Sequence, residues 1–168
     1  MKRVRERPPS TLPADLAEEI GKERAFDIAG QEAYLNLIRT RSVLAAAFAP
    51  VFRGAGLGEA QYNALRIVTA SGSVGVRIDT IRRQLVDRDP DVSRLVDRLE
   101  KAELVVREND PDDRRAVRIV ATEAGRLLAR GLAEELDDIH RTQLSHLAEA
   151  EIAELNRLLF KARHPRST

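Results

Sequence analysis

The chain has 168 residues, 43% of them hydrophobic and 33% charged, which suits a soluble, helix-rich domain with a real core and argues against overall disorder. It has no cysteine, which excludes disulfides, thiolate zinc sites, a cysteine nucleophile and a thiol redox switch. The net charge is +1, and residues 76–118 carry as many acidic as basic side chains, so bulk charge does not indicate a nucleic-acid-binding protein.

Residues 1–30 are predicted to form a basic arm and a short extra helix. Residues 1–13 are basic and rich in proline, as in a solvated tail, and Leu16 and Ile20 follow at helical spacing. No apolar run comes after the basic start, where a signal peptide would have one. The longest apolar run, residues 43–52, is far shorter than a membrane span, so we expect a cytoplasmic protein with no membrane partner.

Two helices are predicted next, over residues 31–52 and 58–70. The first is indicated by apolar side chains at helical spacing, namely Tyr34, Leu37, Ile38, Leu44, Ala45, Phe48 and Phe52. The second is indicated by Tyr62, Leu65, Ile67 and Val68. Glycines at 54, 56 and 58 suggest a phosphate loop, but they follow a helix and lack the P-loop lysine. They therefore predict a helix-to-helix turn.

Residues 71–102 have the pattern of a helix-turn-helix. A loop ending in a very short strand is predicted at its start, and Ile78, Ile81 and Leu85 then mark the first helix. After a turn at 86–88, Asp89 and Pro90 are predicted to begin the second helix, because Asp accepts hydrogen bonds from the first turn and Pro suits its first position. Apolar residues then recur at helical spacing, at Val92, Leu95, Val96 and Leu99.

After Ala102 the apolar period changes from that of a helix to that of strands. Residues 104–106 and 116–120 predict two strands, joined by a charged turn over 109–115. A short helix followed by such a ribbon predicts a winged helix-turn-helix, whose helix enters a major groove while the tip of the wing reaches the neighbouring minor groove. The predicted fold class is mainly α with a small β wing and terminal helices.

Two further helices are predicted after the wing. Thr122 is expected to cap a long one, with apolar positions at Leu127, Leu128, Leu132, Leu136, Ile139, Leu144 and Leu147. The other runs from residue 149 to about 162 and shows Ile152, Leu155, Leu158 and Leu159. These two helices have more apolar surface than a winged domain of this size can cover. That surface is buried either by packing against the helix at 31–52 or by a two-fold dimer, and we expect the dimer.

Three motifs in this region carry a family resemblance. The run VSRLVDRLE, the wing LVVRENDPDDRRAVRI and the sequence Thr122-Glu123-Ala124-Gly125 resemble the MarR family of bacterial transcriptional regulators, loosely over residues 34–160. The resemblance implies a homodimer that binds a pseudo-palindrome in double-stranded DNA, and a ligand-responsive repressor. Glu103 stands where the family usually has Gly, which predicts a different helix end. Ala121 stands where it usually has Leu, which predicts a smaller apolar contact.

The predicted DNA-binding domain covers residues 58–121, between helical dimerisation regions at 31–57 and 122–168. Its recognition helix spans about 90–102 and its wing 104–120. The candidate DNA-binding residues of the helix and the wing are Pro90, Asp91, Ser93, Arg94 and Arg98, with Asp113, Arg114 and Arg115. By resemblance, Arg115 enters the minor groove, and Asp113 is expected to orient it. Arg77, Arg82 and Arg83 either reach phosphates or form a solvated basic face.

The resemblance also implies an effector, a small phenolic or lipophilic anion held in a crevice. Tyr34, Arg41, Tyr62 and Arg66 lie on the two helices expected to flank that crevice, because arginine beside aromatic rings suits such an anion. The alternative is that both tyrosines are core residues and both arginines are solvated.

The sequence carries no recognised motif for metal binding or catalysis. The three histidines contain no pair four residues apart, so no metal site is predicted. There is no serine-nucleophile motif, no carboxylate pair in an apolar context and no dinucleotide fingerprint, so neither an enzyme nor a cofactor is predicted. Two alternatives stay open. One is a winged-helix module that binds a protein, favoured by Asp87, Asp89 and Asp91 near the expected groove, and the other is an enzyme with an unrecognised site.

Overall fold

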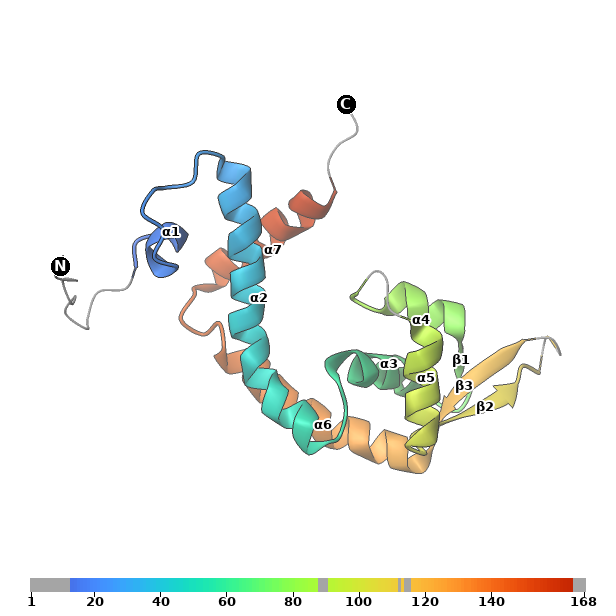
Figure 1. The fold of residues 1–168 in the computed structure, drawn as a ribbon. Helices are drawn as coiled ribbons and strands as arrows, with labels where there is room; N and C mark the ends of the chain where they lie inside the picture. Colours follow the sequence, from blue (N-terminus) through green and yellow to red (C-terminus); the bar gives the residue numbers. More distant parts are fainter. Residues whose placement is uncertain (1–12, 88–90, 112, 114–115, 165–168) are drawn as a thin grey trace, which may run out of the picture. The chain divides into compact units, whose positions relative to one another are not determined.

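The computed structural model describes residues 13–87, 91–111, 113 and 116–164 (Figure 1). The chain divides into two compact units, Met1–Ala45 and Ala46–Thr168, and each is described by itself. One helix, α2 (Ala29–Gly54), begins in the first unit and ends in the second. Its bounds agree with the helix predicted over residues 31–52.

The first unit contains α1 (Leu16–Glu19) and the beginning of α2. Asp15 caps α1, because its Oδ1 accepts a hydrogen bond from the Glu18 N–H at 2.9 Å. The predicted extra helix is therefore present and only one turn long. Glu19, its last residue, pairs with Arg39 of α2 at 2.8 Å. Large apolar side chains of α2 are exposed in this unit, at Tyr34, Leu37, Ile38 and Val43.

The second unit holds a three-stranded antiparallel sheet among helices. Its elements after α2 are α3 (Glu59–Ala70), β1 (Val76–Arg77), α4 (Ile78–Gln84), α5 (Val92–Lys101), β2 (Val105–Asn109), β3 (Val117–Ala121), α6 (Glu123–Thr142) and α7 (Glu149–Arg163). The strand order is β1-β3-β2, so the predicted very short strand pairs with the wing, Val76 opposite Ile119. The fold class, mainly α with a small β wing, is confirmed.

The core of the second unit is formed by the positions that carry helical or strand periodicity in the sequence. Leu65 of α3, Ile81 of α4, Leu99 of α5 and Ile119 of β3 are each fully buried. These side chains come from all three predicted helices of the winged domain and from its sheet. Burial of each contributes roughly 1.5–3 kcal/mol, so this shared core fixes α5 and the wing relative to each other.

The start of α5 corrects one prediction. The N-cap is Asp91, whose Oδ1 accepts a hydrogen bond from the Arg94 N–H at 3.1 Å, whereas Asp89 and Pro90 were expected to begin the helix. Those two residues lie outside the described part of the chain. Asp91 is as good a cap as Asp89, and a helix that begins after it places Val92, which is 1% exposed, in the core.

The end of α5 corrects another. Glu103 takes the left-handed conformation itself, with φ 58°, so the helix ends as it would with Gly. The Leu104 N–H donates to the Leu99 carbonyl and the Glu103 N–H donates to the Glu100 carbonyl, both at 2.9 Å. These two bonds form a Schellman motif, and Leu99 and Leu104 are both buried in the core, as such a motif favours. The packing of Leu104 holds Glu103 in a conformation that costs a non-glycine residue about 1–2 kcal/mol.

The helix α6 is shorter than predicted. It begins after Thr122, as expected, but ends at Thr142, so Leu144 and Leu147 lie in a turn. The Thr142 hydroxyl donates to the Asp138 carbonyl at 2.8 Å, and the Ser145 N–H bonds the Thr142 carbonyl at 3.1 Å, which turns the chain. The next helix, α7, matches its prediction closely, yet none of its residues is buried.

Among the described residues, no single helix is both long and apolar enough to cross a membrane. The helices α2 and α3 meet that requirement only together, as a pair bent by 72°.

Candidate nucleic-acid interface

The helix α5 has one buried and one exposed face. Val92, Leu95, Val96 and Leu99 are buried, whereas Ser93, Arg94 and Arg98 are exposed, and so is Asp97. In Figure 1 the ribbon of β2 and β3 lies beside this helix. The helix therefore presents three of the candidate DNA-binding side chains on its solvent face.

The two arginines of α5 differ in their partners. Arg94 Nε lies 3.0 Å from Asp91 Oδ2, so the capping carboxylate also holds this guanidinium. Both side chains are more than half exposed, and an ion pair of this kind is worth about 0–1 kcal/mol, so Arg94 exchanges it for another anion at little cost. Arg98 makes no ion pair with the described residues.

The wing is attached to α5 through Arg107 of β2. Its Nη2 lies 2.6 Å from Asp97 Oδ1, and its Nη1 donates to the Glu100 carboxylate. The hydrogen bond to Asp97, with the charges of Glu100 and Asp97, raises the pKa of Arg107, and partial burial opposes this. The contact sets the position of the wing against the candidate recognition helix, and it was not predicted from the sequence.

The base of the wing is organised around Asp110, whose side chain is fully buried. Arg77 Nη2 lies 2.7 Å from Asp110 Oδ2, and Arg118 Nη2 lies 2.9 Å from Oδ1. Asp113 Oδ2 lies 3.9 Å from the same nitrogen of Arg77. Arg77 is therefore a support for the wing, in addition to its expected place beside α4. Pro90, Arg114 and Arg115 lie outside the described residues.

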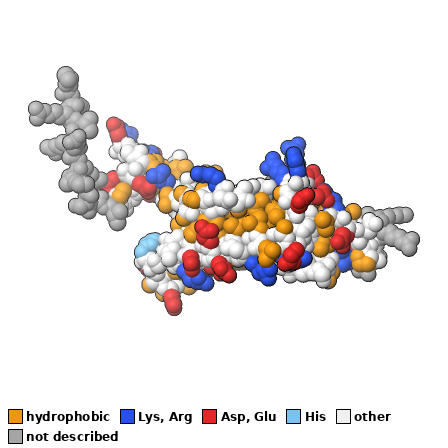
Figure 2. Space-filling model, turned by 90° about the horizontal axis from the view of Figure 1, so that it is seen from below, with side chains coloured by type: hydrophobic (Ala, Val, Ile, Leu, Met, Phe, Trp, Pro, Cys, Tyr) orange, Lys and Arg blue, Asp and Glu red, His pale blue; other side chains and the backbone are white. Residues whose placement is uncertain are grey.

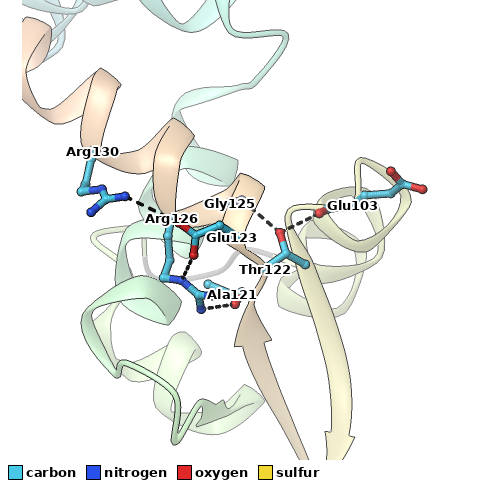
Figure 3. A network of polar contacts seen from close by, with 7 residues as sticks. All are labelled: Glu103, Ala121, Thr122, Glu123, Gly125, Arg126 and Arg130. Atoms are coloured by element: carbon cyan, nitrogen blue, oxygen red, sulfur yellow. Dashed lines mark hydrogen bonds and ion pairs between the residues drawn. The ribbon is translucent and has the colours of Figure 1, made fainter.

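The junction between β3 and α6 explains the Thr122-Glu123-Ala124-Gly125 motif (Figure 3). Thr122 Oγ1 accepts a hydrogen bond from the Gly125 N–H at 3.0 Å and donates one to the Glu103 carbonyl at 2.7 Å. Gly125 is required because any Cβ there would overlap the carbonyl oxygen of Leu104. The first turn of α6 is thus locked onto the end of α5.

Tyr62 and Arg66 of α3 line two neighbouring cavities with residues of α6. One cavity, of about 430 Å³, also contains Phe48, Phe52 and His140, and the rings of Phe48 and His140 lie 4.8 Å apart. The other, of about 320 Å³, is lined by Tyr62, Arg66, Thr69, Ala70, Arg126, Ala129, Arg130 and Ala133. Tyr34 and Arg41, the other two candidate effector residues, belong to the first unit.

Tyr62 is a buried residue whose ring packs 5.6 Å from that of Phe52. Burial raises the pKa of its hydroxyl above the ordinary value, Arg66 lowers it, and Asp137 raises it. The hydroxyl therefore stays protonated at neutral pH and is able to donate a hydrogen bond.

One face of the molecule has hydrophobic side chains at the surface, bordered by charged ones (Figure 2). Large apolar side chains of the second unit that are exposed include Val86, Leu127, Leu158 and Phe160. Single exposed apolar residues are ordinary on monomers, but α7 differs in having no buried residue at all.

Comparison with known proteins gives three kinds of similarity. The model of the MarR family matches residues 57–117, which include α3, α5 and β2. The HTH-type transcriptional regulator FarR of Neisseria gonorrhoeae is 30% identical over 104 residues, covering 62% of this chain and 70% of FarR.

Two of the similar crystal structures cover almost the whole of the matching protein. A MarR transcription factor from Planctomyces limnophilus is 38% identical, with a TM-score of 0.60, over 80% of this chain and 98% of that one. CouR from Rhodococcus jostii RHA1, bound to p-coumaroyl-CoA, is 25% identical, with a TM-score of 0.68, over 85% of this chain and 99% of CouR.

Proposed function

This chain belongs to the MarR family of transcriptional regulators, and on that premise we propose that it binds double-stranded DNA as a homodimer. The observation that supports this best is the exposed face of α5. Ser93, Arg94 and Arg98 are exposed to solvent there, while the opposite face of the helix is buried in the core. A two-fold dimer presents two such helices about one helical turn apart, roughly 34–36 Å, so the operator is a pseudo-palindrome.

We assign the base contacts to α5 and the groove-flanking contacts to the wing. Arg94 and Arg98 are suited to the O6 and N7 acceptors of guanine in the major groove, and Ser93 to either kind of base. Asp91, the N-cap of the helix, is proposed to lie near the same groove, and so is Pro90, which precedes it in the sequence. Arg115 enters the minor groove, oriented by Asp113, and Arg114 contacts the DNA backbone.

The dimer interface is proposed to use the terminal helices, in the regions 31–57 and 122–168. Along the described part of the chain, α7 buries none of its residues, and Leu158 is 48% exposed. Tyr34 and Leu37 of α2 are exposed as well. Permanent homodimers of this kind often bury roughly 2,000 Å² or more.

Regulation is proposed to be repression that an effector relieves. CouR was crystallised with p-coumaroyl-CoA, an anion with an aromatic body. In this chain, the cavity that contains Phe48, Phe52, Tyr62 and Arg66 has the aromatic rings and the guanidinium that a small phenolic or lipophilic anion needs. A regulator of this kind acts where the DNA is, in the cytoplasm.

To test this, DNA fragments that the protein binds are selected from randomised DNA. The affinity of the protein for the selected fragments is then measured by gel shift. Arg98→Ala should weaken binding about 5-fold to 150-fold and relax the preference at one base pair, because a bidentate contact discriminates by about 1–3 kcal/mol. Arg141→Ala is the matched control, since Arg141 is exposed on α6 and pairs with Asp138. If the protein is a folded dimer and the selection yields no preferred DNA sequence, sequence-specific DNA binding is contradicted. That result would favour a winged-helix module that binds a protein.

A further inference from the structure

We propose that Arg107 of β2 is a positioning residue for DNA recognition. Its contacts with Asp97 and Glu100 of α5, here called the Arg107 bridge, hold the wing at a fixed distance from the recognition helix. That distance sets how many base pairs separate the bases that α5 reads from the minor-groove contact of the wing. The proposal rests on the proposed function for its effect on DNA, whereas the position of the wing is measured without DNA.

The Arg107 bridge joins one guanidinium to two carboxylates. Nη2 of Arg107 lies 2.6 Å from Asp97 Oδ1, and Nη1 donates to the Glu100 carboxylate. Asp97 and Glu100 are three residues apart, so they are neighbours on the surface of α5. The guanidinium is planar and its donors form a rigid fork, so two contacts fix its direction where a single contact would let it rotate. The bridge therefore restrains the strand against sliding along α5.

The bridge lies where the apolar core ends and the exposed part of the ribbon begins. Val105, the first residue of β2, is fully buried opposite Ala121, whereas the rest of β2 is exposed. Arg107, in the middle of β2, pairs with Ile119, the buried residue of β3 nearest the tip of the wing. In Figure 1 the ribbon runs on beyond the end of α5 from this region. The bridge therefore holds the ribbon to α5 at the last point that the core supports.

A second polar anchor holds the wing to a different element. Asp110, which follows β2, pairs with Arg77 of β1 and with Arg118 of β3. These contacts join the wing to the start of the helix-turn-helix rather than to α5. The Arg107 bridge has a different consequence, because it relates the wing directly to the helix that is proposed to read the bases.

The Arg107 bridge is a weak source of stability. The side chain of Asp97 is 61% exposed, and those of Glu100 and Arg107 are 37% and 31% exposed. Ion pairs as accessible to water as these add little to the free energy of folding. Loss of the bridge should therefore leave the protein folded and change the position of the wing.

A small displacement of the wing is enough to change its contact with DNA. Successive base pairs are about 3.4 Å apart along the duplex, so a shift of this size moves the tip from one base pair to the next. With α5 seated in the major groove, a wing held by the bridge reaches the minor groove at one spacing, whereas a wing without the bridge reaches it at several. The bridge should therefore make the affinity for DNA depend on the spacing between the two contacts.

A role of charge alone is the alternative to positioning. Arg107 also compensates two carboxylates of α5, so its loss would add repulsion from the DNA phosphates. Phosphate repulsion carries no sequence information, so it would weaken binding equally at every spacing. Lysine has the same charge without the planar fork. Arg107→Lys therefore separates positioning from charge.

The first measurement follows the wing without DNA. The chain has no cysteine, so Lys101→Cys on α5 and Asn109→Cys on β2, both exposed, give two positions for spin labels. The labelled protein is diluted with unlabelled protein, so that electron paramagnetic resonance measures the distance within one protomer.

Adding Arg107→Gln should broaden the distribution of label distances by about 3 Å, the step from one base pair to the next. Arg141→Gln is the control, since Arg141 is exposed on α6 and pairs with Asp138, and it should leave the distribution unchanged. The thermal midpoint should fall by no more than about 4 °C in Arg107→Gln, as expected for a partly exposed ion pair. An unchanged distribution in Arg107→Gln would overturn the proposal.

The second measurement varies the spacing on DNA. In the operator obtained by selection, one G·C pair is inserted in each half-site between the bases assigned to α5 and the A·T pairs assigned to the wing. The insertion should weaken binding of the wild type at least about fivefold, as expected for loss of a specific arginine contact. Arg107→Gln should bind the two operators with nearly equal affinity, and Arg107→Lys should lose most of the preference. Weaker binding of Arg107→Gln to both operators, with the full preference kept, would overturn positioning in favour of charge.

The third measurement tests the partner of Arg107 on α5. Asp97→Asn should reduce the preference for the original spacing, because the guanidinium keeps only its contact with Glu100. Adding Asp97→Asn to Arg107→Gln should reduce the preference no further, since the contact is already absent. A further loss of the preference in the double variant would show that the two residues act independently, and it would overturn the proposal.

These measurements distinguish failure of this proposal from failure of the proposed function. A chain that selects no DNA sequence, but shows broader label distances in Arg107→Gln, contradicts the proposed function and supports the role of the bridge in holding the wing. A chain that binds its selected DNA, and whose Arg107→Gln variant keeps the full spacing preference, retains the proposed function and overturns the proposal.

Discussion

The guanidinium of Arg77 meets the buried carboxylate of Asp110, with its Nε and Nη2 each 2.7 Å from Asp110 Oδ2. Arg77 is the last residue of β1 and directly precedes α4, while Asp110 follows the end of β2. This pair thus joins the start of the helix-turn-helix to the base of the wing. Arg118 of β3 holds the other oxygen of the same carboxylate.

Asp110→Asn should lower the free energy of unfolding by about 1–3 kcal/mol, because two arginines lose a charged partner and the side chain is buried. This loss of unfolding free energy is smaller than the loss expected for a fully buried ion pair, because the Arg77 side chain is 48% exposed. Chemical denaturation measures it. Asp138→Asn is the control, because this exposed carboxylate also pairs with an arginine, and it should change stability by less than about 0.5 kcal/mol. Equal effects would show that Asp110 is only another surface partner.

The left-handed Glu103 gives a prediction of the opposite sign. Glu103→Gly should raise the free energy of unfolding by about 0.5–1 kcal/mol, because glycine removes a left-handed strain of about 1–2 kcal/mol and adds some chain entropy to the unfolded state. Glu103→Ala keeps the strained Cβ and should have little effect. Thermal unfolding compares the three proteins. A gain for both variants would mean that the glutamate charge, rather than the backbone, is unfavourable.

Two glycines of α6 form a matched pair for substitution by alanine. Gly125→Ala places a Cβ against the Leu104 carbonyl. It should lower the free energy of unfolding by about 2–4 kcal/mol, because backbone rather than a flexible side chain must move. Gly131 lies in the same helix, where a Cβ would meet nothing within 4 Å. Gly131→Ala should therefore stabilise it by about 0.5–1 kcal/mol. Similar effects at both positions would contradict the close approach of α6 to Leu104.

The proposed dimer is tested on α7, where Leu158 is 48% exposed, and Asn156, two residues earlier and therefore on another side of the helix, is also exposed. Leu158→Glu places an unpaired charge in each half of a two-fold interface and should produce a monomer at micromolar concentration, whereas Asn156→Glu should leave the dimer intact. Analytical ultracentrifugation gives the answer. A folded wild-type monomer at the same concentration would refute the interface.

The sequence predicted the elements that apolar periodicity controls. Leu65, Ile81 and Leu99 lie in the core as expected, and the short strand before α4 pairs with the wing. Periodicity says nothing of where a helix stops, so Leu144 and Leu147, which continue the spacing of α6, were wrongly placed in it. The left-handed Glu103 was missed because residue type alone favours glycine there, while the packing of Leu104 decides the conformation.

The polar contacts of the site were harder to predict than its helices. Arg77 and Asp110 are 33 residues apart, and their contact depends on the place of β1 at the edge of the sheet. Likewise, the pair of Arg107 with Asp97 needs the packing of β2 beside α5. In contrast, the Thr122 cap is local and was predicted correctly, because its partner is the N–H of Gly125 three residues later.

The last prediction separates the two adjacent arginines of the wing. Arg115 is proposed to enter the minor groove, which is narrow and strongly negative in A-tracts and attracts a weakly hydrated, planar guanidinium. Arg115→Ala should therefore weaken DNA binding by about 1–3 kcal/mol and reduce the preference at the flanking A·T pairs. Arg114→Ala should have a smaller effect that does not depend on sequence, and Arg115→Lys should recover part of the loss. Gel shifts on operators with A·T or G·C flanks distinguish these outcomes. If the two alanine variants lose the same affinity on both operators, the wing contributes only general electrostatic attraction.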